Sequence, residues 1–286
     1  MVASKDMLRD AGGPPTPATI GEDLAQWAKD HGAGVDRRLA QRLADVVTRI
    51  APDLPAAGRR LLARYSLWTF LLDDELDDVT AGPDALAELA GRLITLVRTA
   101  TAASTPTRTI EAMLAEIVIE LRSVGPPALL ARFDDALCTA ISTGVQHTVR
   151  AQQLRQGRAG APTAVEYLTV AGHHINYCSF AYALLILTRA TPTAAAAQRI
   201  DKALVAASRA IRIANDLASA DRDRAEGRLN IVLLPPADTV DIAALERQVD
   251  RYVRLHDRLL RDTADAGVLR RSLHTAVAVY RVTDLR

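Results

Sequence analysis

The sequence predicts an all-α protein, and three observations support this fold class. Alanine, leucine and arginine are abundant throughout the chain, and these residues favour helices. Segments in which apolar and polar residues alternate, as they do in strands, are scarce. Glycine and proline mostly lie between the helical segments, where helices begin or end. No spacing repeats along the chain, so a single helical domain is the simplest architecture.

The predicted helices follow one another with short breaks. They lie at about residues 21–31, 35–50, 55–79, 83–99, 107–123, 127–157, 163–190, 193–225, 239–265 and 267–283. The residues that separate them are Pro52 and Pro55, Gly82 and Pro83, Pro106, Gly125 to Pro127, Gly160 to Pro162, Pro192, and Pro235 with Pro236. Residues 1–20 contain a glycine- and proline-rich run and are expected to form a disordered leader before a domain at 21–286. Gly172 inside the segment 163–190 predicts either a kink or a close helix crossing.

Composition bounds the function. The chain has 286 residues, of which 49% are hydrophobic, and its 35 basic residues nearly balance its 34 acidic ones. The protein therefore has no large positive net charge that would favour binding to nucleic acid or to an anionic membrane. The two cysteines, Cys138 and Cys178, lie in apolar contexts that suggest reduced thiols. We find no bilayer-length apolar run and no secretory signal, so we expect a cytoplasmic protein without membrane insertion.

The first candidate site is the segment Leu71–Asp78, which has five carboxylates in six positions directly after an apolar run. On a helix, Asp73 and Asp77 share one face, and Phe70 and Ser66 extend that face toward the N-terminus. Like charges one turn apart repel, so the pair needs a cation or a basic partner. Mg²⁺ takes such oxygen ligands and completes its shell with water and phosphate oxygens. The alternative is an acidic helix end exposed to solvent.

The second candidate site lies near the end of the segment 193–225. Asn215, Ser219 and Asp223 are spaced four residues apart, so their oxygen donors fall on one face and suit one Mg²⁺. Arg212 and Arg222 project near the same stripe, and guanidinium groups there can bind a diphosphate in bidentate fashion. The alternative is a polar outer face with arginine–aspartate pairs.

Together the two motifs resemble those of class I terpene synthases. The first matches the family's DDxxD, here Asp73-Asp74-Glu75-Leu76-Asp77, and the second matches (N/D)Dxx(S/T)xxx(E/D), here Asn215 to Asp223. The resemblance implies a single-domain helical bundle with a central active-site cavity. It also implies that the two motifs face each other across the mouth of this cavity and hold three Mg²⁺ ions against a substrate diphosphate.

The resemblance covers roughly residues 35 to 285 and implies further diphosphate ligands. Arg222 falls where the family keeps a basic residue that binds diphosphate. Tyr280 and Arg281 look like the family's Arg-Tyr pair in reversed order. Many bacterial members carry a diphosphate-sensing arginine on the helix before the break, but the segment 167–174 has none.

The implied reaction is ionisation of a prenyl diphosphate, which leaves an allyl cation in an apolar cavity that excludes water. Aromatic faces stabilise such cations. The candidate cavity residues are Phe70, Ser66, His173 and Tyr177, although each also suits an ordinary core position. His173 and His174 are candidates for the base that takes the final proton or for partners of the diphosphate, and the alternative is that they are ordinary helix-packing histidines.

The chain has only two tryptophans, six tyrosines and three phenylalanines, which favours a substrate that is little folded or already partly cyclised. The implied enzyme is therefore a carbon–oxygen lyase that acts on a C20 diphosphate, either geranylgeranyl or copalyl diphosphate. The alternatives are a sesquiterpene cyclase that uses farnesyl diphosphate, a chain-elongating prenyltransferase of the same fold, and a non-catalytic helical binding protein. The resemblance also allows a homodimer.

Overall fold

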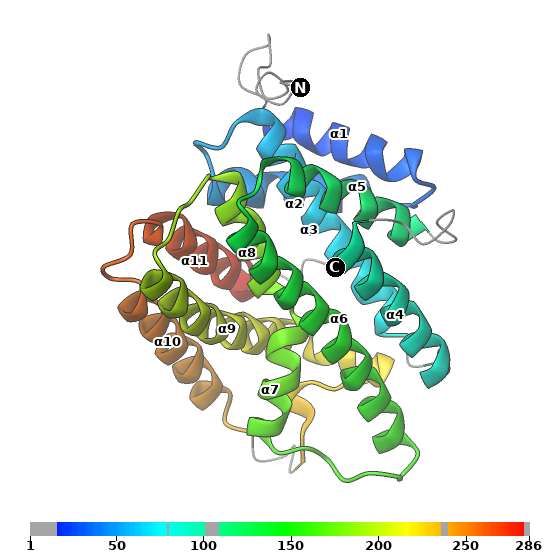
Figure 1. Cartoon of the computed structure of the whole chain (residues 1–286). Coiled ribbons are helices and arrows are strands. Elements are labelled where there is room, and N and C mark those ends of the chain that lie inside the picture. The colour runs from blue at the N-terminus through cyan, green and yellow to red at the C-terminus, as the bar shows by residue number, and fades with distance from the viewer. Residues whose placement is uncertain (1–15, 79, 101–108, 236–239, 283–286) are drawn as a thin grey trace.

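The computed structural model describes residues 16–78, 80–100, 109–235 and 240–282, and it confirms the all-α fold (Figure 1). The helices are α1 (Pro17–Asp30), α2 (Arg37–Ile50), α3 (Ala56–Leu76), α4 (Pro83–Thr99), α5 (Thr109–Val124), α6 (Pro127–Arg155), α7 (Ala164–His174), α8 (Tyr177–Leu187), α9 (Ala194–Glu226), the 3-10 helix η1 (Ile231–Leu233), α10 (Ile242–Leu259) and α11 (Ala266–Val282). No strand occurs among the described residues.

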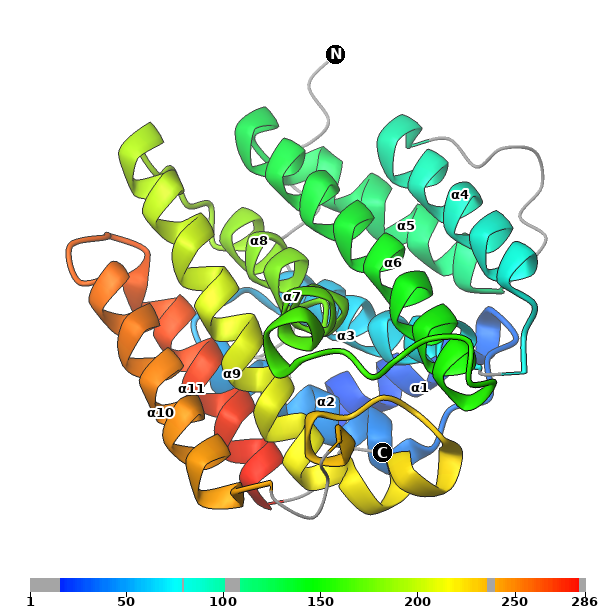
Figure 2. The ribbon, with the colours of Figure 1, turned by 90° about the horizontal axis from the view of Figure 1, so that it is seen from below.

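Five of these helices close into a ring. α2 packs on α3, α3 on α8, α8 on α9, α9 on α11, and α11 returns to α2. α4, α5 and α6 pack outside this ring on one side, α10 covers α9 on the other, and Figure 2 shows α7 between α6 and α9. A ring of helices leaves a space along its axis that only side chains can fill, and this is where the candidate site lies.

α3 forms one wall of the ring and ends at the acidic motif. Its middle is buried on several sides, with Leu62, Tyr65 and Trp68 wholly covered. The Trp68 indole donates a hydrogen bond to the carbonyl of Ile110, 2.8 Å away, which fixes α3 against α5. The helix ends at Leu76 rather than continuing to residue 79 as predicted. Its last turn contains no basic residue, so the acids lie at the end of the helix dipole that disfavours negative charge.

The predicted helix 163–190 is broken into α7 and α8. The break lies at Ile175 and Asn176, where Asn176 adopts a left-handed backbone with φ of 58°. Asparagine tolerates this conformation better than most residues. Gly172, which predicted a kink or a close crossing, lies three residues before the break and faces α9. A Cβ there would lie 3.4 Å from the Arg209 side chain, so close helix packing is the better interpretation of Gly172.

Two further sequence predictions need correction. The leader was expected to reach residue 20, but α1 begins at Pro17 and Ile20 is fully buried. The rest of the predicted leader, residues 1–15, lies outside the described residues. One stretch, Ala164–Leu187, is long and apolar enough to cross a membrane by length and composition, although we expected none. It spans the broken pair α7 and α8, and 67% of its apolar 18-residue window is buried inside the protein, which is typical of core helices. The single domain at 21–286 stays a prediction.

A buried network holds the break in place. The Tyr65 hydroxyl donates to Ser179 Oγ at 2.7 Å and accepts from Asn176 Nδ2 at 3.3 Å. The network therefore ties α3 to the residue at which the chain turns from α7 into α8. Burial raises the pKa of the Tyr65 hydroxyl, so it stays protonated and able to donate.

We expect Tyr65→Phe to lower the free energy of unfolding by about 1–3 kcal/mol, because it leaves buried polar groups on Asn176 and Ser179 short of a partner. Urea denaturation followed by circular dichroism measures this. Tyr252→Phe is the control, because the hydroxyl of this half-buried tyrosine on α10 accepts a long hydrogen bond of 3.5 Å from Gln248, and it should change stability by less than about 0.5 kcal/mol. Equal effects of the two substitutions would contradict a structural role for the network.

Candidate active site

The acidic end of α3 meets the end of α7. His174 Nε2 lies 3.1 Å from Asp73 Oδ1 and 3.7 Å from Asp77 Oδ1. Potential ligand atoms of these three side chains all lie within 4.8 Å of one another. Asp73 and Asp77 therefore share a face as the sequence predicted, and both line one cavity. Asp74, the second acid of the motif, points outward and does not line this cavity.

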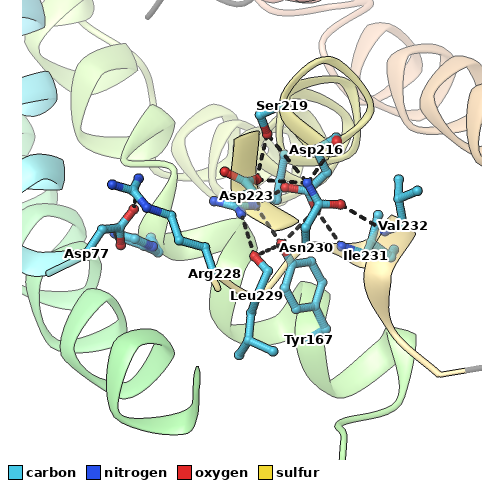
Figure 3. A network of polar contacts seen from close by, with 12 residues as sticks. Asp77, Tyr167, Asp216, Ser219, Asp223, Arg228, Leu229, Asn230, Ile231 and Val232 are labelled. Carbon is cyan, nitrogen blue, oxygen red and sulfur yellow. Dashed lines mark hydrogen bonds and ion pairs between the residues drawn. The ribbon is translucent and has the colours of Figure 1, made fainter. Parts of the chain in front are cut away.

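Arg228 is a partner of the acidic motif that the sequence analysis missed. Its Nη1 donates to Asp77 Oδ2 at 2.9 Å (Figure 3). Its Nε lies 2.8 Å from Glu226 Oε2. The chain reverses after α9 at Gly227, whose φ of 69° favours glycine, and this turn brings Arg228 back toward α3. Nothing in the local sequence distinguishes Arg228 from its neighbour Arg224, which pairs with Asp221 at the surface.

Burial and neighbouring charges shift the pKa values of the side chains at this end of α3 and α7. Burial, and then the nearby Asp73 carboxylate, raise the pKa of Asp77. Burial alone would lower the pKa of His174, but the Asp77 and Asp73 carboxylates outweigh it and raise that pKa. Burial and the Arg212 guanidinium hold the pKa of the neighbouring His147 well below its usual value, so this imidazole stays neutral.

The second motif lines the opposite side of the same cavity. Asn215, Ser219 and Asp223 follow one face of α9, and Asn215 and Asp223 reach the cavity. Ser219 is buried, and its hydroxyl donates to Asp223 Oδ2 at 2.7 Å. Asp223 lies near the C-terminus of α9, so it shares the unfavourable dipole position of the α3 acids.

A fully buried asparagine supports this second motif. Asn230 Nδ2 donates to Asp223 Oδ2 at 2.8 Å and to the carbonyl of Asp216 at 2.8 Å (Figure 3). Its own Oδ1 accepts from Val232 N and so begins η1. The sequence analysis missed Asn230, and its only local signal is that of a helix N-cap.

Arg212 is held differently from what the sequence predicted. It was expected to bind diphosphate from an open helix face, but its Nε lies 2.8 Å from Asp216 Oδ1 and donates to the Tyr167 hydroxyl at 2.9 Å. The Tyr167 hydroxyl in turn donates to Asp216 Oδ2 at 2.7 Å (Figure 3). Asp216 is fully buried, so this triad fastens α7 to α9. Arg212 lines the cavity, but its guanidinium is committed to this buried pair.

The other predicted diphosphate ligands divide into two groups. Arg222 lines the cavity with its Nη2 3.7 Å from Asp223 Oδ1, and Tyr280 lines it from α11. Arg281 is placed away from the site. Its Nη2 binds Glu246 and Asp250 on α10 at 2.9 and 2.8 Å, and it does not line the cavity.

The cavity has a polar mouth and an apolar chamber. The mouth, of about 70 Å³, contains both motifs, and the chamber, of about 120 Å³, lies within the helix ring. They share the lining residues Thr69, Phe70, Ile175, Asn176 and Tyr280, so the two spaces are neighbours separated by these side chains. Of the predicted cavity residues, Phe70, Ser66 and Tyr177 line the chamber. His173 lines neither space, and His174 takes the place at the mouth.

These donors fit divalent metal ions. Asp77 Oδ1 is buried and has no hydrogen-bond partner among the described residues, which is costly unless a cation satisfies it. The mouth also offers the Asn215 and Asp223 oxygens on its other wall. Hard divalent cations prefer such oxygen ligands.

Comparison with known proteins agrees with this geometry. The sequence profile described as terpene synthase family 2, C-terminal metal binding, matches residues 64–261. Linalool/nerolidol synthase from Streptomyces clavuligerus, solved with 2-fluorogeranyl diphosphate, aligns with a TM-score of 0.75 at 19% identity, over 93% of this chain and 96% of that one. A single-residue variant of cucumene synthase aligns with a TM-score of 0.73 at 17% identity, over 98% and 99%. No curated protein sequence matches significantly.

The neutral His147 predicts a pH dependence of stability. Because its pKa is lower in the folded protein than the usual 6.5, the unfolded chain binds more protons in acid, and stability is lost as the pH falls through the unfolded value. We expect the melting temperature of the metal-free protein to fall less in His147→Phe than in wild type between about pH 7.5 and about pH 5.5. Scanning calorimetry measures this, and parallel pH profiles of the two proteins would contradict it.

Proposed function

Because the chain belongs to the terpene synthase family, we propose that it is a class I cyclase whose cavity takes a C15 prenyl diphosphate. Membership of the family makes it a lyase that acts on prenyl diphosphates with a divalent metal. The observation that supports the cyclase proposal best is the two-part cavity, with oxygen donors and arginines at the mouth and an apolar chamber behind it. A diphosphate would lie in the mouth and its hydrocarbon chain in the chamber.

The metal ligands would come from both walls of the mouth. Asp73 and Asp77 would provide ligands from the α3 side, and Asn215, Ser219 and Asp223 from the α9 side. We propose that three divalent metal ions such as Mg²⁺ bind here. When bound, they supply the positive charge that a departing diphosphate needs. Ser219 now donates to Asp223, so its oxygen lone pairs remain able to accept a metal.

The guanidinium groups at the mouth would receive the diphosphate. Arg222 lies beside Asp223, and Arg228 lies beside Asp77, so one arginine accompanies each motif. Their planar forks can each donate two hydrogen bonds to phosphate oxygens. Tyr280 lies at the junction of the mouth and the chamber, where its hydroxyl could reach the leaving group.

The chamber would protect the cation formed when diphosphate leaves. Seven of its fifteen lining residues are aliphatic, and four are aromatic, namely Phe70, Tyr177, Phe180 and Tyr280. Aromatic faces stabilise a desolvated cation by up to about 2 kcal/mol. The C20 expectation rested on the scarcity of aromatic residues in the whole chain, but four of those few residues gather at the chamber. Their presence at the chamber supports the shorter C15 chain.

An assay of product formation tests this proposal. We expect incubation with farnesyl diphosphate and Mg²⁺ or Mn²⁺ to give cyclic C15 hydrocarbons or alcohols, identified by gas chromatography with mass spectrometry. Geranyl, geranylgeranyl and copalyl diphosphates are the parallel substrates. Turnover of only the C20 substrates would overturn the proposed C15 chain length. Formation of longer prenyl diphosphates as products would indicate a chain-elongating enzyme. A homodimer and a cytoplasmic location stay predictions.

Loss of a metal ligand should abolish chemistry without unfolding the protein. We expect Asp73→Ala or Asn215→Ala to lower the rate of diphosphate release about 100-fold or more. The free energy of unfolding of the metal-free protein should change by less than about 1 kcal/mol, because Asp73 also repels Asp77. Asp221→Ala is the control, since that side chain is 99% exposed on the same helix. A large loss of stability in Asp73→Ala would make the motif structural.

Arg222 should act mainly in the transition state, when the leaving group gains charge. We expect Arg222→Ala to lower kcat by about 10- to 100-fold, and Arg222→Lys to lower it less, because lysine keeps the charge but loses the planar fork. Steady-state kinetics at saturating metal measure this. Arg224→Ala is the matched control, because Arg224 lies two residues away at the surface and pairs with Asp221. Wild-type turnover in Arg222→Ala would refute its role.

A further inference from the structure

A histidine from a distant part of the chain lies against the acidic motif. His174 comes from α7, about a hundred residues after the motif, yet its Nε2 lies 3.1 Å from Asp73 Oδ1 and 3.7 Å from Asp77 Oδ1. The three side chains therefore present two carboxylate oxygens and one imidazole nitrogen within 4.8 Å of one another. This is the spacing of ligands around a single metal ion.

The imidazole is buried and held against the two carboxylates. His174 is only 5% exposed, and neither of its ring nitrogens has a hydrogen bond of suitable geometry among the described residues. The absence of a side chain at Gly144 on α6 makes room for the ring, since a Cβ there would lie 3.0 Å from His174 Cδ2. The His147 ring packs on it with centroids 5.2 Å apart. A buried nitrogen that is held against two carboxylates needs either a proton shared with them or a metal.

The donor set decides which metal suits the site. Mg²⁺ is a hard ion that takes oxygen ligands and binds imidazole poorly, whereas Mn²⁺ and the later first-row ions accept imidazole nitrogen readily. A site with two carboxylates and one imidazole should therefore rank these ions above Mg²⁺.

We propose that His174 Nε2 is a ligand of the metal ion bound by Asp73 and Asp77, and that this site selects Mn²⁺ or a later first-row divalent ion over Mg²⁺. This inference rests on the proposed function, since it concerns the metal at the same mouth. The rival role of His174 is that of a cationic partner of the acids. Arg228 already donates to Asp77 Oδ2, so that carboxylate has a cationic partner without the histidine.

Pulsed electron paramagnetic resonance on the full chain tests the ligand directly. The probe is Mn²⁺ added below one equivalent to the metal-free protein, with and without inorganic diphosphate. We expect the echo-envelope modulation of bound Mn²⁺ to show coupling to a directly bound ¹⁴N nucleus. This coupling should vanish in His174→Phe, which keeps a ring beside Gly144. It should persist in His147→Phe and His173→Phe, which remove the nearest other histidines.

Calorimetric titration gives the second measurement. We expect His174→Phe to weaken Mn²⁺ binding about tenfold and to leave Mg²⁺ binding nearly unchanged, because only Mn²⁺ gains from the nitrogen ligand. Bound Mn²⁺ without ¹⁴N coupling in the wild-type protein would overturn the proposal while leaving the cyclase function intact, and it would assign His174 to charge neutralisation. If neither Mn²⁺ nor Mg²⁺ binds even with diphosphate, both the ligand assignment and the proposed function fail.

Discussion

Repulsion between the carboxylates of Asp73 and Asp77 is the constraint on which the mouth of the cavity depends. The two acids lie one turn apart at the C-terminal end of α3, where the helix dipole adds to their mutual repulsion. Asp77 is also buried enough for its pKa to rise. Two side chains from elsewhere in the chain lie against the pair, His174 on α7 and Arg228 in the turn after α9. A protein selected only for stability would replace these acids, so their presence indicates a ligand that stabilises them.

α9 repeats this arrangement on the other wall. Asp223 also lies near a helix C-terminus, and its Oδ2 receives hydrogen bonds from Ser219 and Asn230. The buried triad of Arg212, Asp216 and Tyr167 lies just below and fastens α9 to α7. Asn215 and Asp223 line the mouth, and Ser219 supports Asp223 by a hydrogen bond. The second residue of the motif, Asp216, is structural. One short motif thus combines residues that face the ligand with a residue that holds the helix in place.

The hydrocarbon side of the cavity depends on the ring of helices. Each helix of the ring contributes at least one apolar side chain, and the break at Asn176 interrupts the wall between the mouth and the chamber. The Tyr65 network fixes this break from the neighbouring helix α3. The same helices therefore bind the diphosphate at one end of the ring and protect the cation further along it. This arrangement can keep the leaving group apart from the cation.

The sequence by itself determined the helices and the two oxygen-donor faces, because helical periodicity is local. Spacings of four residues place Asp73 with Asp77, and Asn215 with Ser219 and Asp223, on shared faces in any straight helix. Breakers likewise predicted most helix ends within a few residues. Only the tertiary structure decided which side chains from elsewhere in the chain meet these faces. His174, Arg228 and Asn230 reach the site through a helix break and a glycine turn, and no local periodicity encodes such meetings. For the same reason Arg212 and Arg281, which suit diphosphate by type and position in the sequence, were found paired with Asp216 and with two acids of α10.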